Sequence, residues 1–193
     1  SRQSRGLGDV YKRQEPPDDL APQFDYIRKS VLAFNLPSVE LINYEADDLI
    51  ATYVDKILEK GSKVTIVSSD KDLMQLYRKD VRIFDPMKNK FISNEDVKNK
   101  FGVDPDKVID VQALAGDSSD NVPGVPGIGV KTAAELINKY GDLETLLKSA
   151  DEIKQNKRRE TLLNNKDKAL ISKKLVTLKP VSYTHLTLPT KWI

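Results

Sequence analysis

Seven carboxylates fall into three short groups, Glu45-x-Asp47-Asp48, Asp70-x-Asp72 and Asp117-x-x-Asp120. Like charges packed into one pocket cannot all stay ionised unless a divalent cation neutralises them. Because the chain contains no cysteine, the ligands of such an ion would have to be oxygen atoms. The three groups therefore predict a site for a divalent metal.

The last acidic group leads directly into a loop rich in glycine and proline, VPGVPGIGVKT, at residues 122–132. Gly124, Gly127 and Gly129 would let the backbone approach a phosphate closely. Lys131 and Thr132, at the start of the next helix, would add a cation and a hydroxyl. This helix-hairpin-helix pattern predicts binding to the DNA backbone with little dependence on base sequence. Combined with the acidic groups, it predicts metal-dependent cleavage of a phosphodiester.

Two of the acidic groups also have a simpler interpretation. Acids in the first turn of a helix, such as Glu45, Asp47 and Asp48, are favoured by the helix dipole alone. Asp70 and Asp72 could form a turn and a helix cap, or the Asp-x-Asp of a phosphatase that forms an aspartyl-phosphate. Leu73 argues against the phosphatase, because threonine or valine is usual there in that family. A DNA-binding module without nuclease activity is the other alternative.

The apolar spacing predicts the elements that position these groups. We expect a helix from Phe24 to about Asn35, a short strand over 38–43, and a helix over 46–60. A strand over 63–69 is apolar enough to be buried on both faces of a parallel sheet, and another strand is expected over 81–86. Strand, helix and strand in this order indicate an α/β fold, with ligands at the carboxyl edge of its sheet.

After Ser93 the pattern changes to short helices with clear start and stop signals. Ser93 and Asp96 form a capping box, and Gly102, Gly116 and Gly141 stand at helix ends. We therefore predict an incomplete α/β parallel-sheet nuclease lobe over 15–92 and a helical helix-hairpin-helix DNA-binding lobe over 93–180. Residues 1–14 and 181–193 show no connected periodicity and are interpreted as non-native tails.

The charge, the cysteine content and the lengths of the apolar runs limit the classes of protein to which the chain can belong. The chain has 31 Lys and Arg against 29 Asp and Glu, and neutralising the acidic groups would leave a surface that attracts nucleic acid modestly. The absence of cysteine predicts a protein of the cytoplasm, and the absence of any long apolar run predicts that it does not enter a membrane. We also expect a monomer.

Three segments, YEADDLIATYV at 44–54, VTIVSSDKDLMQL at 64–76 and ALAGDSSDNVPGVPGIGVKTAAELI at 113–137, occur in a specific order. Together they resemble the 5′–3′ exonuclease domain of bacterial DNA polymerase I, which is part of the flap endonuclease family. The resemblance extends from about Glu15 to Pro180. It implies an α/β nuclease lobe, a helical DNA-binding lobe, and hydrolysis of 5′ flaps and nicked duplex DNA.

The resemblance also implies two Mg²⁺ or Mn²⁺ ions held by catalytic carboxylates. Glu45 and Asp47, with Asp48 in support, match the first metal site of the family, and the second site is matched by Asp70, Asp72, Asp117 and Asp120. The family pattern has a further aspartate on an N-terminal strand, which is not found ahead of Glu15. The expectation is a fragment that cleaves flap DNA poorly and whose sheet has an unpaired edge.

Overall fold

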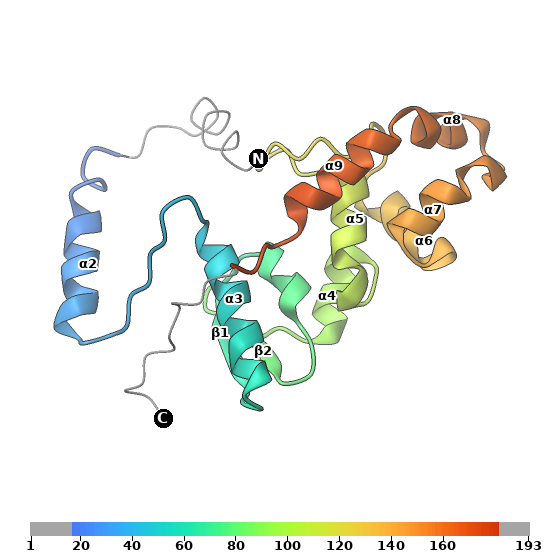
Figure 1. Cartoon of the computed structure of the whole chain (residues 1–193). Helices are drawn as coiled ribbons and strands as arrows, with labels where there is room; N and C mark the ends of the chain where they lie inside the picture. The colour runs from blue at the N-terminus through green and yellow to red at the C-terminus, as the bar shows by residue number, and fades with distance from the viewer. Residues whose placement is uncertain (1–16, 182–193) are drawn as a thin grey trace. The chain divides into compact units, whose positions relative to one another are not determined.

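The computed structural model describes residues 17–181, and Figure 1 traces them. The α-helices and β-strands are α2 (Gln23–Ala33), α3 (Ala46–Glu59), β1 (Val64–Val67), β2 (Val81–Asp85), β3 (Lys90–Phe91), α4 (Asn94–Phe101), α5 (Val108–Ala115), α6 (Val130–Tyr140), α7 (Leu143–Lys148), α8 (Asn156–Asn164) and α9 (Lys166–Val176). Short 3₁₀ helices are η1 (Asp72–Leu76), η2 (Pro105–Lys107) and η3 (Ala150–Glu152). An α/β part followed by helices is the predicted order, and this prediction is confirmed.

The chain divides into two compact units, Ser1–Tyr53 with Lys179–Ile193 and Val54–Leu178. Helix α3 begins in the first unit and ends in the second. The boundary predicted at residue 93 falls inside the second unit, so the division into lobes 15–92 and 93–180 stays a prediction. The predicted tail 1–14 and all of the predicted tail 181–193 except Val181 lie outside the described residues.

In the first unit, α2 forms where the apolar spacing predicts it, and Asn35 just after it has a positive φ of 53°. The strand predicted over 38–43 is wrong. Val39 and Ile42 are exposed, and Asn43 adopts a φ of 71° that interrupts an extended chain. A strand needs a partner for its backbone groups, and this segment pairs with no strand of residues 17–181.

Residues 179–181 lie along the first turns of α3. The Val181 N–H donates to Thr52 Oγ1 at 2.7 Å, and that hydroxyl donates to the Asp48 carbonyl oxygen at 2.6 Å. Val181 is buried, although the sequence placed it in a tail. These bonds join the end of the described chain to α3 within the first unit.

The sheet of the second unit has the order β1-β2-β3. Strands β1 and β2 are parallel, with Val64 opposite Val81, and β3 is antiparallel to β2. The prediction that β1 is buried on both faces is wrong, because Ile66 is buried while Thr65 and Val67 are exposed. Within the described chain β1 has β2 as its one neighbour, so its other edge is unpaired, as expected.

Several helices after residue 93 begin or end at residues that the sequence predicts. Ser93 and Asp96 make a reciprocal capping box at the start of α4, and Gly102, in the left-handed region, ends that helix. Helix α5 packs against both α6 and α9, which lie beside it in Figure 1. Apolar side chains from these helices are fully buried, including Val111, Leu114 and Ile137. This core holds the loop between α5 and α6 that carries Asp117 and Asp120.

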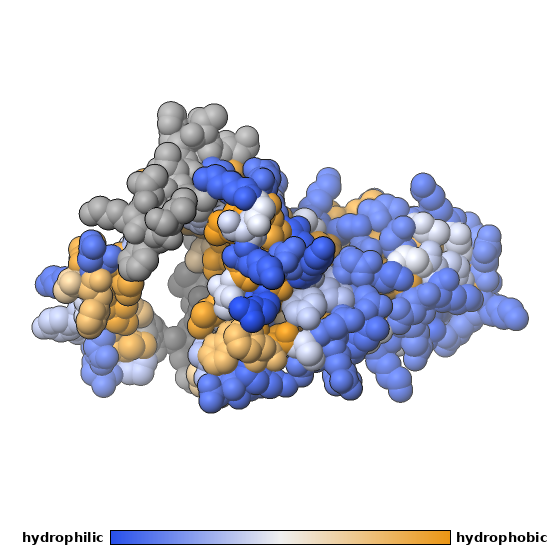
Figure 2. All heavy atoms as spheres, turned by 90° about the horizontal axis from the view of Figure 1, so that it is seen from below, coloured by the Kyte–Doolittle hydropathy of each residue, from blue (hydrophilic) through white to orange (hydrophobic). Residues whose placement is uncertain are grey.

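Figure 2 shows one face of the molecule, on which apolar side chains gather on α2. No residue of α2 is buried, and Tyr26, Leu32 and Phe34 are all more than two-thirds exposed. Among residues 17–181 there is no helix with both the length and the apolar character needed to cross a bilayer.

Candidate metal centre

Three of the predicted carboxylates converge in the second unit. Asp72, Asp117 and Asp120 each offer a carboxylate oxygen, and these oxygens lie within 4.8 Å of one another. Asp72 begins η1, which follows the carboxyl end of β1, while the other two aspartates lie in the loop after α5. All three residues are half-buried. We refer to these three residues as the acidic cluster.

The loop that carries two of these aspartates is closed by its own backbone. The Asp117 N–H donates to the Val122 carbonyl oxygen at 3.0 Å, and the reverse bond measures 2.8 Å. Within the loop the Ser119 N–H donates to Asp117 Oδ1 at 2.9 Å, and Asn121 has a φ of 53°. These contacts keep Asp117 and Asp120 on a tight turn, so that both can face one ion.

Close contact between two glycines holds this loop against the end of α5. A Cβ atom on Gly124 would lie 2.5 Å from the Gly116 nitrogen, which is far inside contact distance. The Gly124 N–H donates to Ser172 Oγ of α9 at 2.9 Å. This N–H is therefore already bonded, and Gly124 packs closely against the end of α5; its predicted contact with phosphate stays a prediction.

The acidic cluster does not include Asp70, which was predicted to bind the same ion, and that role of Asp70 stays a prediction. Asp70 is exposed, and its Oδ1 accepts a hydrogen bond from the Asp72 N–H at 2.9 Å. The Asp70 N–H in turn donates to Ser68 Oγ at 3.0 Å. Asp70 thus shapes the turn that leads into η1, and three of the four predicted residues are brought together.

A lysine already supplies positive charge to the cluster. Lys71 forms an ion pair with Asp117, a residue 46 positions away in sequence. Burial alone would lower the pKa of Lys71, but the hydrogen bond and charge of Asp117 outweigh it and raise this pKa. Burial likewise opposes ionisation of Asp117, yet the Lys71 hydrogen bond holds the Asp117 pKa below its usual value. Asp117 is therefore ionised at neutral pH.

Asp72 has the opposite shift. Burial raises the pKa of its carboxyl group, and the charges of Asp70 and Asp120 add to this effect. A hydrogen bond from Gln112 acts in the other direction but does not cancel it. Burial and neighbouring negative charge both disfavour a second ionised carboxylate beside Asp117. A cation bound at the cluster would offset both effects and favour the ionised form of Asp72.

This chemistry fits a divalent cation. Carboxylate oxygens are the preferred ligands of hard cations such as Mg²⁺ and Mn²⁺. The Lys71 ammonium is in contact with Asp117, so the cluster is already arranged around positive charge. Asp72, Asp117 and Asp120 are the residues that would hold the ion.

Sequence reasoning did not identify Gln112, which lies on α5 and is buried. Its Nε2 donates to Asp72 Oδ1 at 2.7 Å. The signal in the sequence is its position as an uncharged polar residue inside the largely apolar segment VIDVQALA. Such a residue needs a partner in the core.

Glu45, Asp47 and Asp48 belong to the first unit, at the start of α3. Glu45 is exposed and Asp47 half-buried, whereas Asp48 is 3% exposed and accepts the Lys179 N–H at 2.8 Å through Oδ1. That bond gives Asp48 a structural role in holding residues 179–181. The assignment of these three acids to a metal site stays a prediction.

The hairpin presents an open helix start. Gly129 is the N-cap of α6, and no side chain caps this helix. Gly127 and Gly129 are exposed, and no described residue accepts a hydrogen bond from either N–H. Lys131 is exposed and Thr132 half-buried in the first turn. These residues offer backbone N–H groups and a cation to an anion.

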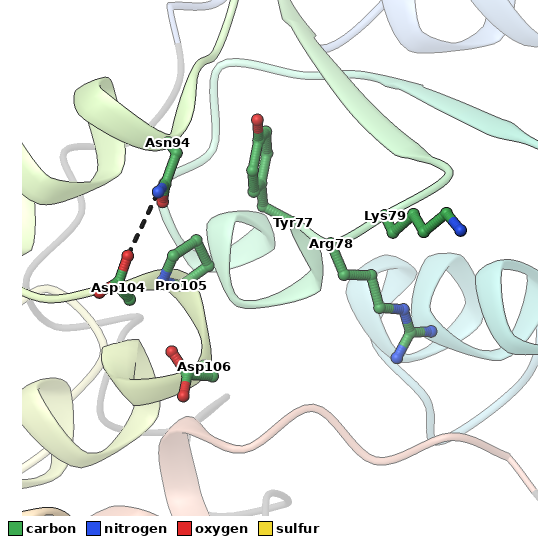
Figure 3. Close-up of a pocket in the computed structure, with 7 residues that line it drawn as sticks. All are labelled: Tyr77, Arg78, Lys79, Asn94, Asp104, Pro105 and Asp106. Atoms are coloured by element: carbon green, nitrogen blue, oxygen red, sulfur yellow. Dashed lines mark hydrogen bonds between the residues drawn. The ribbon is translucent and has the colours of Figure 1, made fainter.

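A hollow of about 470 Å³ lies elsewhere in the second unit. Figure 3 shows its lining residues, Tyr77, Arg78, Lys79, Asn94, Asp104, Pro105 and Asp106. Asn94 donates to Asp104 at 3.2 Å, and Arg78 forms an ion pair with Asp55. None of the acidic cluster lines this hollow, so it is separate from the candidate metal centre.

Two family models match consecutive parts of the chain. Residues 9–102 match the model described as "5′-3′ exonuclease, N-terminal resolvase-like domain". Residues 103–190 match "5′-3′ exonuclease, C-terminal SAM fold". Both matches extend into the segments 1–14 and 181–193, which were predicted to be non-native tails.

The curated relatives of this chain include proteins named DNA polymerase I and 5′-3′ exonuclease. The chain is 56% identical over 177 residues to DNA polymerase I of Rhizobium leguminosarum, a match that covers 91% of this chain and 17% of the relative. It is 42% identical over 178 residues to a 5′-3′ exonuclease of Aquifex aeolicus, covering 91% and 59%. The chain therefore spans less than a fifth of the first relative and about three-fifths of the second.

A solved structure has the same fold. The D15 flap endonuclease of bacteriophage T5, described as a pseudo-enzyme-product complex with DNA and metal ions, aligns with a TM-score of 0.76 at 24% identity. The alignment covers 90% of this chain and 66% of the phage protein. This likeness supports the fold described above, an α/β part followed by a helical part.

Proposed function

Because the chain belongs to the 5′-3′ exonuclease family, we propose that it hydrolyses DNA phosphodiesters at 5′ ends and 5′ flaps with the help of divalent metal ions. The convergence of Asp72, Asp117 and Asp120 is the observation that carries the proposal. The phage flap endonuclease that shares the fold has been seen with DNA and metal ions, which supports both parts of it.

In this proposal the acidic cluster holds one Mg²⁺ or Mn²⁺ ion, and Asp70 shapes the turn that presents Asp72. Glu45, Asp47 and Asp48 would serve a second ion, as the family resemblance implies. A divalent ion held by these residues would supply the activation of water and the stabilisation of the leaving oxygen in phosphodiester hydrolysis. The cluster itself contributes a set of oxygen ligands, and Lys71 contributes positive charge beside Asp117.

We further propose that Gly127, Gly129, Lys131 and Thr132 bind the DNA backbone. The open N-terminus of α6 supports this, since its uncapped N–H groups suit a phosphate oxygen. Nicked and flapped duplexes are the proposed substrates. Because the whole cluster comes from one chain, no second copy is needed to form it, and we propose a monomer that acts on DNA in the cytoplasm.

The test pairs metal binding with DNA cleavage. Asp117→Asn combined with Asp120→Asn should abolish calorimetric Mg²⁺ or Mn²⁺ binding and any metal-dependent cleavage of a labelled 5′-flap substrate. The matched control, Asp151→Asn with Asp167→Asn, makes the same charge change at two exposed positions and should leave both intact.

Unchanged metal binding in the Asp117 and Asp120 double variant would overturn the metal centre. Cleavage that continues in EDTA would also contradict the proposal. Metal and DNA binding without cleavage would instead favour the alternative, a DNA-binding module without nuclease activity.

A further inference from the structure

Gln112 is a polar residue in the core beneath the acidic cluster. It is 5% exposed, and its neighbours on α5, Val111 and Ala113, are fully buried. Its Nε2 donates to Asp72 Oδ1 at 2.7 Å across 40 residues of sequence. This is a side-chain bond between the helix that precedes the acidic loop and the 3₁₀ helix that carries the third carboxylate.

The chemistry of the pair determines which way the amide points. In the observed bond the Gln112 amide nitrogen is the donor and Asp72 Oδ1 the acceptor, so an amide oxygen turned toward Asp72 Oδ1 would face another acceptor. The amide nitrogen therefore faces Asp72, and Gln112 Oε1 points elsewhere. That oxygen is buried and has no hydrogen-bond partner among residues 17–181.

An unsatisfied buried oxygen lowers stability, whereas an apolar side chain of the same length would not have this cost. Gln112 is thus poorly suited to a purely structural place in this core. Its favourable polar contact is the bond to a carboxylate that the proposed function assigns to the metal.

We propose that Gln112 is a positioning residue for the metal centre, which holds the Asp72 carboxylate in the orientation that the ion requires. The inference rests on the proposed function, because Asp72 is one of the proposed ligands. A hydrogen bond to one carboxylate oxygen restricts rotation of the whole group, so less ordering is needed when the ion binds. Partners of this kind commonly change metal affinity by about 10–100-fold when they are removed.

Gln75 is a suitable residue for comparison, because it lies on η1, the 3₁₀ helix that also carries Asp72. Gln75 Nε2 donates to the Val176 carbonyl oxygen at 3.1 Å, and Gln75 Oε1 accepts from the Leu178 N–H at 3.1 Å. These bonds hold η1 to the end of α9. Gln75 also donates to the Asp72 backbone carbonyl at 2.9 Å, but it makes no bond to the Asp72 carboxylate. A substitution of Gln75 therefore shows how loosening of η1 alone affects Mg²⁺ affinity.

The experiment compares Gln112→Met with Gln75→Met by Mg²⁺ calorimetry and by thermal unfolding with and without Mg²⁺. Gln112→Met should weaken Mg²⁺ binding by about 10–100-fold. Its midpoint of unfolding without Mg²⁺ should change little, because the lost bond and the removed buried oxygen act in opposite directions. Gln75→Met should lower that midpoint while leaving the Mg²⁺ affinity nearly unchanged. If Gln112→Met does not fold, Gln112→Leu replaces it.

Equal losses of Mg²⁺ affinity in the two variants would overturn the inference, because general loosening of η1 would then explain both. Unchanged affinity in Gln112→Met would overturn it as well. Either result, with normal binding by the unaltered chain, leaves the proposed metal centre standing. A failure of the unaltered chain to bind Mg²⁺ would instead refute the metal centre on which the inference depends.

Discussion

The Lys71 ammonium has two consequences for the acidic cluster. It neutralises part of the negative charge when no metal is bound, and it occupies Asp117, which the ion would also use. Its side chain is 37% exposed, while that of Asp117 is 10% exposed, so solvent weakens the pair without removing it. The same residue is therefore expected to stabilise the metal-free protein and to compete with the ion.

Lys71→Met tests this at the scale of a single residue. The free energy of unfolding without metal should fall by about 1–2 kcal/mol, because Asp117 loses its counter-charge. Added Mg²⁺ should then raise the unfolding midpoint more in the variant than in the unaltered protein. Lys98→Met is the control, since the pair with Asp104 is about half exposed on both sides. A smaller Mg²⁺ effect in Lys71→Met would contradict the competition.

At the scale of elements, two of the glycines in the loop between α5 and α6 have different roles. Gly124 and Gly127 both have positive φ, at 59° and 74°. Gly124→Ala should be severely destabilising, by several kcal/mol, because its Cβ would overlap backbone atoms. Gly127→Ala meets no atom within 4 Å and should cost about 1–2 kcal/mol for its backbone conformation alone. Chemical denaturation measures both, and equal losses would refute the packing role of Gly124.

Lys173 joins three helices of the same region. Its Nζ lies 2.7 Å from Asp110 Oδ1 on α5 and 2.8 Å from Glu144 Oε1 on α7. Burial alone would lower the pKa of Lys173, but the bonds to Asp110 and Glu144 raise it. The Lys173 hydrogen bond also holds the Glu144 pKa below its usual 4.5. α9 is therefore anchored by charge as well as by apolar packing.

Lys173→Met should lower the free energy of unfolding by about 2 kcal/mol at neutral pH, because Asp110 is left without its cation. A carboxyl whose pKa is lowered by folding stabilises above its unfolded pKa, and this contribution is lost as the pH falls through the folded value. The deficit of the variant should accordingly shrink below pH 4.5, where Glu144 begins to lose its contribution. Lys174→Met, at an exposed neighbour, is the control. A deficit independent of pH would contradict the ionic role.

At the scale of the whole molecule, affinity for DNA should be separable from metal binding. Lys131→Ala should weaken duplex binding and reduce the salt dependence of the affinity by about one unit, because one phosphate contact is lost. Lys139→Ala removes the same charge from the last turn of α6 and should have a smaller effect. Asp70→Asn should leave binding largely intact. Fluorescence anisotropy over a salt series measures all three, and no change in Lys131→Ala would refute the hairpin interface.

Local signals in the sequence determined much of the helical part. The Ser93 capping box and the stops at Gly102 and Gly141 depend on hydrogen bonds within a few residues, and all three are present as predicted. The helices α3 and α6 also follow their apolar periodicity. Each of these features forms from neighbours in the chain, so the residues that decide it can be read together.

Tertiary structure decided which residues meet. The segment 38–43 has the composition of a strand but no partner, and the exposed face of β1 depends on what covers the sheet. Asp72 joins Asp117 while Asp70, two residues away, turns aside to bond the backbone. The bonds of Gln112 to Asp72 and of Ser172 to Gly124 join segments 40 and 48 residues apart. No local pattern contains both partners of such a bond, because packing of the whole unit brings them together.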